Sequence, residues 1–199
     1  MKKLIDSHFQ DLYAALENVQ YTGRQGELLD RAEAYERTLR LALEATDRGG
    51  KQMFIGNGGS AAIASHMAID FTKNGGMPAM CFNDGAALTC LSNDFGYEEV
   101  FAHQLRAHAR KGDVLFAISS SGSSENILRA VAVARACECA VITMTGFKPG
   151  NNLRALGDVN FYLPVSDYGL VEVGHTAMIH AVVDLKMASS LAVGARISE

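Results

Sequence analysis

The sequence predicts an α/β fold in three layers: a doubly wound, five-stranded parallel sheet covered by helices, with further helices at the N-terminus. Two observations carry this prediction. Beyond residue 50, short apolar runs alternate with stretches of helical periodicity, as in parallel sheets that are buried on both faces. The chain has 199 residues, 48% of them hydrophobic, which is enough for the core of one domain. We therefore expect a single domain over residues 1–199.

The first 49 residues are predicted to form a helical extension of that domain. Apolar side chains recur there at spacings of three to four, which is the helical period. They are Ile5, Phe9, Leu12 and Leu16 in the first helix, and Leu28, Ala32, Tyr35, Leu39 and Leu43 in the second. The glycine-containing residues 21–26 separate the two helices as a break.

Five short apolar runs predict the parallel strands. They cover residues 53–55, 78–82, 114–118, 140–144 and 160–163. Helical periodicity predicts helices over residues 61–71 and 127–136, and a last long helix over residues 169–193. In such sheets ligands bind at the carboxyl ends of the strands, so the loops that follow them are the candidate sites.

Charge and hydropathy exclude several classes of protein. A net charge of -4 and a pI near 5.9 give no basic surface for nucleic acid. The N-terminus carries no apolar leader, and no apolar stretch is long enough to cross a bilayer. We expect a soluble, cytoplasmic protein with no nucleic-acid or membrane partner.

The first candidate site is the stretch 56–61, Gly-Asn-Gly-Gly-Ser-Ala, between a predicted strand and a predicted helix. Glycines let a ligand approach the backbone, Ser60 can cap the helix, and the helix N-terminus favours an anion. Ala61 fits a dinucleotide-binding fingerprint, for which Asp84 would supply the acid. A tight turn without a ligand stays an alternative. A P-loop is excluded, because no Gly-Lys-Ser/Thr follows.

The second candidate site is the stretch 119–126, Ser-Ser-Ser-Gly-Ser-Ser-Glu-Asn, again between a strand and a helix. Five hydroxyls and one glycine form a cup of O–H and N–H donors without a cation. Such donors bind a phosphate monoester through hydrogen bonds and the helix dipole. A flexible serine linker is the alternative, and the apolar strand and helix that flank the stretch disfavour it.

Histidines and carboxylates on two helices form the third candidate site. His66 and Asp70 are four residues apart, so they share one face of their helix. Spacings of three and eight are expected to place Glu172, His175 and His180 near one face of the last helix. Two such sets suit a zinc-class metal or proton transfer, whereas each histidine alone is compatible with a structural role.

The pair Asn93 and Asp94 leaves two interpretations open. Asp94 either caps a helix boundary, or the pair reaches the ligand.

Together these motifs resemble the SIS (sugar isomerase) domain superfamily, and within it the phosphoheptose isomerase family. The resemblance covers nearly the whole chain and implies a flavodoxin-like sheet. It rests on the stretches 56–60, 92–96, 112–115 and 118–124, and on the spacing of Glu172, His175 and His180. The two loops together are specific to the superfamily, and the positions of His66 and His180 narrow it to this branch.

The resemblance implies a role for each candidate residue. The phosphate would bind Ser119, Ser120, Ser121 and Ser124, and the sugar would lie near Asn57, Gly58, Ser60, Asn93, Asp94 and Glu172. One zinc ion would be held by His66, Asp70, Glu172 and His180. Asp70 would act as catalytic base with His180 as its acid/base partner, unless the metal occupies Asp70 fully. The family also implies a homotetramer with sites between subunits.

Three positions depart from the family pattern: Asp70 replaces a Glu, Glu172 replaces a Gln and Gly169 replaces an Asp. Asp70 keeps a carboxylate but moves it by about 1.5 Å, the length of one C–C bond. Glu172 adds a negative charge that should strengthen cation binding, and Gly169 removes a contact to the sugar. The three departures therefore leave open a different phosphosugar as the substrate.

The expected activity is aldose–ketose isomerisation of a phosphorylated sugar through an enediol. The family implies sedoheptulose 7-phosphate as substrate and D-glycero-D-manno-heptose 7-phosphate, a lipopolysaccharide precursor, as product. Two alternatives are weighed against it. One is a non-catalytic SIS module, such as a phosphosugar-binding regulator or a DnaA-associating protein, and the other is an NAD-dependent dehydrogenase. Four retained ionisable residues, His66, Asp70, Glu172 and His180, favour the isomerase.

Overall fold

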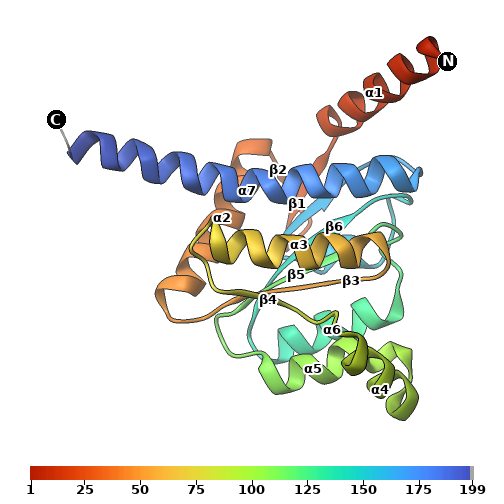
Figure 1. The fold of residues 1–199 in the computed structure, drawn as a ribbon, viewed down its shortest axis with the longest axis vertical. Helices are drawn as coiled ribbons and strands as arrows, with labels where there is room; N and C mark the ends of the chain where they lie inside the picture. The colour runs from red at the N-terminus through yellow and green to blue at the C-terminus, as the bar shows by residue number, and fades with distance from the viewer. Residues whose placement is uncertain (198–199) are drawn as a thin grey trace.

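The computed structural model confirms an α/β fold with a mostly parallel sheet (Figure 1). It describes residues 1–197, and the side chains of residues 1–189. The helices are α1 (Lys2–Glu17), α2 (Arg31–Asp47), α3 (Gly59–Lys73), α4 (Gly85–Phe95), η1 (Tyr97–Glu99), α5 (Val100–His108), α6 (Glu125–Ala136), η2 (Leu153–Ala155) and α7 (Tyr168–Ile197). The strands are β1 (Gln20–Gly23), β2 (Leu28–Leu29), β3 (Gln52–Gly56), β4 (Ala79–Cys81), β5 (Val114–Ser119), β6 (Ala140–Thr145) and β7 (Val159–Tyr162).

Five parallel strands form the centre of the sheet. The strand order is β2-β1-β7-β6-β5-β3-β4, and the strands from β3 to β7 run parallel to one another. Counted along the chain, these five lie in the order 2-1-3-4-5, the flavodoxin-like order of doubly wound sheets. Each of the five predicted strands is present, with ends that differ by at most one residue from the prediction.

The residues predicted to break the N-terminal helices form a β-hairpin instead. Strand β1 pairs antiparallel with β7, and β2 pairs antiparallel with β1, so the sheet has seven strands. Leu28, predicted as helical, lies in β2. The hairpin buries Tyr21 and Leu29, but four- and two-residue strands are too short to show a hydrophobic alternation in the sequence.

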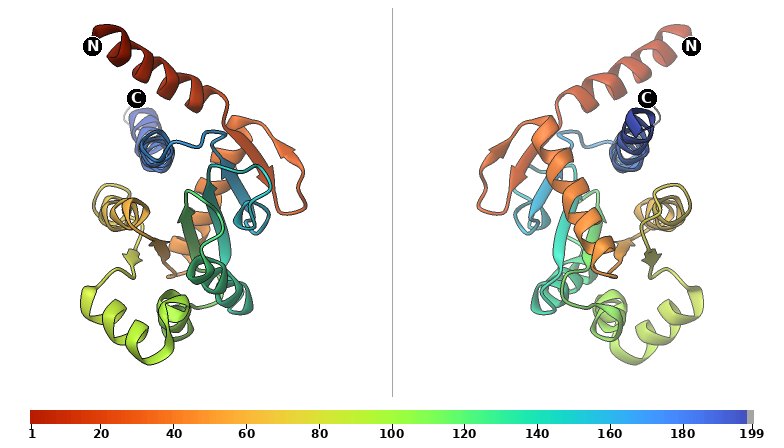
Figure 2. Two further views of the ribbon diagram at one scale, coloured as in Figure 1. Left: turned by 90° about the vertical axis from the view of Figure 1, so that its right-hand side faces the viewer. Right: turned by 90° about the vertical axis from the view of Figure 1, so that its left-hand side faces the viewer.

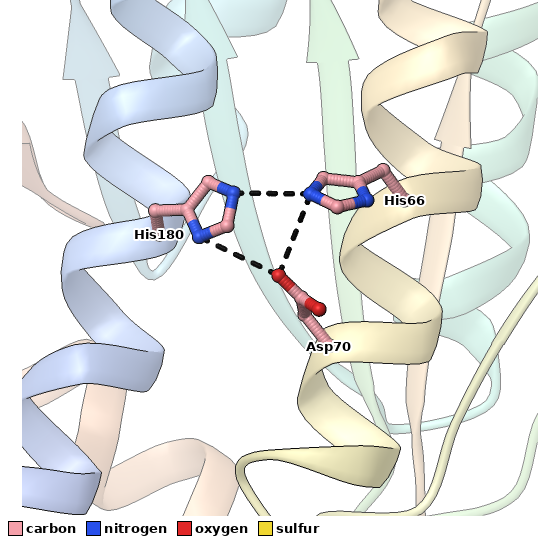
Figure 3. A group of neighbouring side chains, drawn as sticks. All are labelled: His66, Asp70 and His180. Carbon is pink, nitrogen blue, oxygen red and sulfur yellow. Dashed lines mark hydrogen bonds and ion pairs between the residues drawn. The ribbon is translucent and has the colours of Figure 1, made fainter.

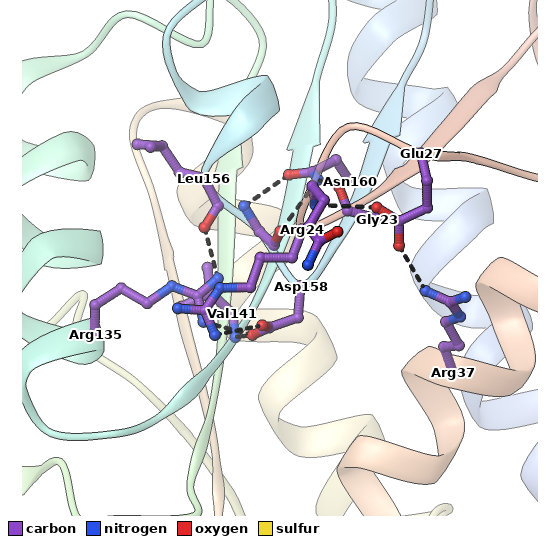
Figure 4. Close-up of polar contacts among 11 residues, drawn as sticks. Gly23, Arg24, Glu27, Arg37, Arg135, Val141, Leu156, Asp158 and Asn160 are labelled. Carbon is purple, nitrogen blue, oxygen red and sulfur yellow. Dashed lines mark hydrogen bonds and ion pairs between the residues drawn. The ribbon is translucent and has the colours of Figure 1, made fainter.

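Polar side chains attach this hairpin to the sheet (Figure 4). Asn160 of β7 donates its amide N–H groups to the carbonyl oxygens of Thr22 and Gly23, at 3.3 Å each. Next to it, Asp158 forms an ion pair with Arg24 of the hairpin turn at 3.6 Å. The first and last strands of the chain are therefore joined by side chains as well as by their backbone ladder.

Alternate side chains of the central strands face two separate cores. Phe54 and Phe116 face the side covered by α2, α3 and α7, where their rings stack with centroids 4.7 Å apart. Met53, Ile55 and Leu115 face the side covered by α5 and α6. Figure 2 shows helices on both sides of the sheet, as the three-layer prediction requires.

Two helical features bear on function. Helices α3 and α7 run alongside each other on one side of the sheet (Figure 1). Helix α1 projects from the body of the domain, and four of its large apolar side chains are exposed: Leu4, Ile5, Phe9 and Tyr13. Within residues 1–197, no helix combines the length and apolar character that crossing a membrane requires.

Candidate active site

The glycine-rich and serine-rich loops lie side by side at the carboxyl edge of the sheet. They follow the neighbouring parallel strands β3 and β5. With the start of α7 they enclose a space of about 230 Å³, here called the loop pocket. It is lined by Asn57, Gly58, Gly59, Ser60, Ser119, Ser120, Ser121, Ser124, Tyr168 and Glu172. All residues predicted to bind substrate, except Asn93 and Asp94, lie in this lining.

The glycine loop turns directly into α3. Gly58 is the N-cap of α3 and has a φ of +55°, a left-handed conformation that favours glycine. The prediction that Ser60 caps this helix is wrong, because the helix begins at Gly59 and Ser60 is buried inside its first turn. Gly56 lies against the backbone of Ser60, and a Cβ there would overlap it. The loop is therefore closed tightly onto its helix.

The serine loop presents hydroxyls and the N-terminus of α6. Ser119 Oγ accepts a hydrogen bond from the N–H of Gly122 at 3.1 Å and lies 3.5 Å from Ser124 Oγ. Ser124 is the N-cap of α6, but its side chain makes no capping hydrogen bond and stays available to a ligand. No lysine or arginine is among the residues that line the loop pocket in the described chain. An anion would therefore be held by neutral donors and the helix dipole.

Helix α7 closes the loop pocket with an acid and an aromatic ring. The carboxylate of Glu172 packs against the Cα atom of Gly59, where any Cβ would overlap it. It lies there at the N-terminal end of α3, a position that favours negative charge. Tyr168 begins α7, and its ring meets Phe147 edge-on with centroids 4.7 Å apart. Tyr168 is not among the residues predicted from the sequence, where its one signal is its place at the start of the last helix.

His66, Asp70 and His180 form a second polar site on α3 and α7, here called the helix cluster (Figure 3). The Nε2 atoms of the two histidines are 3.1 Å apart. Asp70 Oδ2 lies 3.4 Å from His66 Nε2 and 3.5 Å from His180 Nδ1. The Asp70 side chain is only 14% exposed, whereas His66 is 54% exposed and accessible to a ligand.

The helix cluster fits a zinc-class metal ion. Its donors, two imidazole nitrogens and a carboxylate oxygen, are typical zinc ligands. Zn–N bonds of about 2.0–2.1 Å at tetrahedral angles place ligand atoms roughly 3.3 Å apart. The observed separations of 3.1 and 3.4 Å are close to that value. The donor chemistry fits, and so do the two separations from His66 Nε2, whereas the 3.5 Å contact of Asp70 Oδ2 with His180 involves Nδ1, the other ring nitrogen.

Glu172, predicted as a fourth metal ligand, lies outside the helix cluster. It precedes His180 by eight residues on α7, about 12 Å along the helix axis. Among the described residues, the group whose ligand atoms lie within 4.8 Å of one another contains His66, Asp70 and His180. Metal ligation by Glu172 stays a prediction, while the structure places its carboxylate in the loop pocket.

His175 faces neither site. A helix turns by about 100° per residue, so residues 175 and 180 point roughly 140° apart, and the prediction of one shared face is wrong. The His175 ring is buried, with Nε2 3.1 Å from the carbonyl oxygen of Thr145. That oxygen can only accept, so Nε2 carries the proton. Burial lowers the pKa of His175 to about 4 and keeps the ring neutral.

Asn93 and Asp94 lie apart from the loop pocket lining, in the last turn of α4. Both are exposed, and the Asn93 amide donates to Asp94 Oδ1 at 2.9 Å. The interpretation of Asp94 as a helix cap is wrong, since it lies inside the helix. Asp84 is the N-cap of α4, and its side chain accepts a hydrogen bond from the N–H of Ala87 at 2.9 Å. The acid that a dinucleotide site would require is therefore engaged in capping the helix.

Comparison with known proteins identifies the family of this chain. The chain matches the SIS domain family over residues 20–146. It is 35% identical over 191 residues to the phosphoheptose isomerase of Helicobacter hepaticus, covering 93% of this chain and 92% of that protein. The structure of phosphoheptose isomerase from Neisseria gonorrhoeae has a TM-score of 0.80 at 33% identity, covering 93% of this chain and 98% of that one.

A more distant match shows how widely the fold is used. The NanR protein of Vibrio vulnificus, solved in complex with ManNAc-6P, has a TM-score of 0.65 at 21% identity. The match covers 94% of this chain and 64% of that one, and it shows a shared fold alone.

The match to the SIS domain family spans both loops, which confirms the resemblance in the sequence. Within that class, the chain belongs to the phosphoheptose isomerase family.

Proposed function

We propose that this protein is a phosphosugar isomerase that interconverts sedoheptulose 7-phosphate and D-glycero-D-manno-heptose 7-phosphate through an enediol. Its relatives carry the name phosphoheptose isomerase. One observation carries the proposal: a pocket suited to an anion and a cluster suited to proton transfer lie on the same two helices, α3 and α7. A regulator that only binds a phosphosugar would need the first site and not the second.

The spacing of the two sites suits a sugar of this length. Six residues of α3 separate Ser60 from His66, which is about 9 Å along the helix axis. An extended seven-carbon chain from its carbonyl end to a terminal phosphorus is about 10 Å long, from bond lengths near 1.5 Å. A substrate whose phosphate occupies the loop pocket would therefore extend its carbonyl end toward the helix cluster.

The loop pocket would bind the phosphate and orient the sugar. Serine hydroxyls from the loop after β5 and N–H groups from the starts of α3 and α6 can all donate to phosphate oxygens. The phosphate does not change during the reaction, so these contacts contribute equally to ground-state and transition-state binding. In this role Ser119, Ser120, Ser121 and Ser124 are binding residues.

Asp70 would act as the base that removes the proton beside the carbonyl group. His180 would act as its acid/base partner and return a proton to the neighbouring carbon. The proton on Asp70 would pass to His180, and the proton of the neighbouring hydroxyl would move to the former carbonyl oxygen. The Nε2 atoms of His66 and His180 face each other 3.1 Å apart, so a proton can pass between the two rings. Asp70 Oδ2 lies within 3.5 Å of a nitrogen of each ring, so a proton can also pass between the carboxylate and the histidines.

Zinc is the cofactor that we propose for this site, held by His66, Asp70 and His180; the family resemblance implies Glu172 as a fourth ligand, but its carboxylate lies in the loop pocket. When bound, zinc supplies a Lewis acid that polarises the carbonyl group and stabilises negative charge on the enediolate. The donor set and its spacing support this proposal.

We also propose that the chain assembles as a homotetramer, as expected for the family. Two apolar surfaces support self-association. Helix α1 exposes Leu4, Ile5, Phe9 and Tyr13, and a groove of about 890 Å³ lies between α2 and α7, lined by apolar side chains such as Tyr35, Leu39 and Leu185. Size-exclusion chromatography with light scattering tests this state, and Phe9→Asp should lower the mass. The cytoplasmic location stays a prediction.

Turnover of a defined substrate tests the proposed reaction. Purified protein is incubated with sedoheptulose 7-phosphate, with and without added zinc, and the anomeric proton of the aldose is followed by NMR. We expect product with zinc present and exchange of one carbon-bound proton with solvent. Unphosphorylated sedoheptulose is the matched control and should react far more slowly.

The departures at Asp70, Glu172 and Gly169 require a wider panel of five- to seven-carbon sugar phosphates. Preference for a different member would correct the substrate and keep the reaction class. Tight binding of a sugar phosphate without turnover of any member, zinc present, would favour the phosphosugar-binding regulator.

A further inference from the structure

A pair of asparagine side chains joins the two loops of the loop pocket. Asn57 of the glycine loop and Asn126 in the first turn of α6 exchange two amide hydrogen bonds, each 2.9 Å long. The hydroxyl of Tyr97 in η1 donates to the same Asn57 oxygen, also at 2.9 Å. We call these three residues the amide clasp. It connects three segments that are 29 to 69 residues apart in the chain.

The clasp fixes the orientation of Asn57. Its side-chain oxygen accepts two hydrogen bonds, from Asn126 and from Tyr97, and one of its two amide hydrogens is donated to Asn126. Turning one amide over would bring oxygen against oxygen and nitrogen against nitrogen. Asn57 therefore has one N–H left for a ligand, and that N–H has a set direction.

Asn126 is placed to act through Asn57. Its side chain is only 3% exposed, and it is absent from the lining of the loop pocket, whereas Asn57 belongs to that lining. The serine loop, with Ser119, Ser121 and Ser124, directly precedes Asn126 in the chain. Gly58 and Gly59 of the glycine loop directly follow Asn57. The separation of the two donor loops is thus set where the two amides meet.

We infer that Asn126 is a positioning residue for phosphosugar binding: it holds the glycine and serine loops at the separation that lets both donate to one phosphate group. This inference rests on the proposed function. A pocket with no cation in its lining depends on several neutral donors aimed at the anion together, so a small displacement of one loop weakens all of them. The Tyr97 hydrogen bond extends the same constraint to η1, directly after the helix that bears Asn93 and Asp94.

The variant Asn126→Ala tests the inference. We expect KM for the sugar phosphate to rise about tenfold, the effect of losing one to two hydrogen bonds, with kcat within about twofold of the wild type. Calorimetry should show the same rise in Kd. A purely structural role would lower Tm and leave KM unchanged.

Asn160→Ala is the matched control. Asn160 is equally buried and hydrogen-bonded at both ends of its amide, but it lies in β7 and holds the hairpin. It should lower Tm without changing KM. If Asn126→Ala behaves like Asn160→Ala, the inference is wrong.

Two further variants sharpen the test. Tyr97→Phe removes one of the three hydrogen bonds and should raise KM by about two- to threefold. The double variant Asn57→Ala/Asn126→Ala should bind no more weakly than Asn57→Ala alone, because each change already opens the clasp. Fully additive losses would overturn the inference.

The outcomes separate this inference from the proposed reaction. Wild-type protein that binds a sugar phosphate without turnover would refute the isomerase, while the Kd values of the variants still decide on the clasp. Wild-type turnover with an unchanged KM in Asn126→Ala would refute the clasp and leave the isomerase intact.

Discussion

The loop pocket and the helix cluster lie on the same pair of helices but are built from different parts of the chain. The loop pocket consists mainly of glycine backbone and serine hydroxyls, with Glu172 as its one carboxylate. The helix cluster consists of three ionisable side chains within 4.8 Å of one another. Fixed neutral donors bind substrate and transition state alike, whereas ionisable groups transfer protons. Damage to the pocket should therefore change KM, and damage to the cluster should change kcat.

The largest effect is expected from Asp70→Asn. The amide keeps the shape of the side chain but loses the base, so kcat should fall by about a thousandfold, within the range for general acid–base catalysis. His180→Gln should act in the same direction. Kd for the sugar phosphate, measured by calorimetry, should stay within about threefold of the wild type.

A remote aspartate provides the control for this change. Asp47→Asn, at the exposed end of α2, should leave kcat and Kd unchanged. Full turnover in both Asp70→Asn and His180→Gln would show that the helix cluster does not carry out the chemistry.

Removal of metal is expected to have the next largest effect. Dialysis against a chelator should lower turnover by about a hundredfold, and added zinc should restore it, because the Lewis acid would be lost and regained. Metal analysis of His66→Ala should show a loss of bound zinc. Full activity in protein shown to be metal-free would remove zinc from the mechanism.

Ser121→Ala tests the other side of the comparison. Loss of one neutral donor should raise KM by about five- to tenfold, with kcat within about twofold, because the phosphate contact is uniform binding. Ser123→Ala, in the same loop but outside the pocket lining, is the matched control. A fall in kcat at constant KM would mean that Ser121 contacts the reacting end of the sugar.

Glu172→Gln should produce a small gain. The carboxylate lies in a pocket proposed to hold an anion, so removing its charge should lower KM by about two- to threefold at low ionic strength. Bound zinc should not change, because Glu172 is separate from the helix cluster. Loss of zinc in this variant would instead establish Glu172 as a ligand and make the two regions one site.

The smallest effect on activity is expected at His175, which touches neither region. The pKa of its ring is lowered by burial from 6.5 to about 4. As the pH falls, His175 therefore takes up a proton in the unfolded state before it does so in the folded state. The free energy of unfolding should then decrease between pH 6.5 and pH 4, by about 3 kcal/mol in total. His175→Gln keeps a donor to Thr145 without the titration. Urea unfolding at several pH values should show that the free energy of unfolding of this variant depends less on pH than that of the wild type. An unchanged pH dependence would contradict the lowered pKa of His175.

The sequence predicted the parts of the fold whose signal is local. Strands such as 114–119 are buried on both faces, so they appear as continuous apolar runs. The two loops can be predicted because runs of glycine and serine between a strand and a helix are unusual in composition. The hairpin at residues 20–29 is not predicted, because β1 pairs with β7, which is more than 130 residues later in the chain.

The candidate site shows the same limit. His66 and Asp70 are one helical turn apart, and the structure brings them together with His180. Helical spacing separates His175 from His180 by roughly 140°, but which of Glu172, His175 and His180 faces α3 depends on how α7 packs against that helix. Spacing also cannot reveal Asn126, whose role depends on a contact with a residue 69 positions away.

The pairing of β1 with β7 also governs when the protein can finish folding during its synthesis. Asn160 contacts a carbonyl group 138 residues earlier in the chain. At about 5–20 residues per second, a ribosome needs roughly 7–28 s to bridge that distance. For that period the edge of β1 that pairs with β7 has no partner strand. The N-terminal hairpin of this chain is thus made early but can complete its pairing only after β7 has been made.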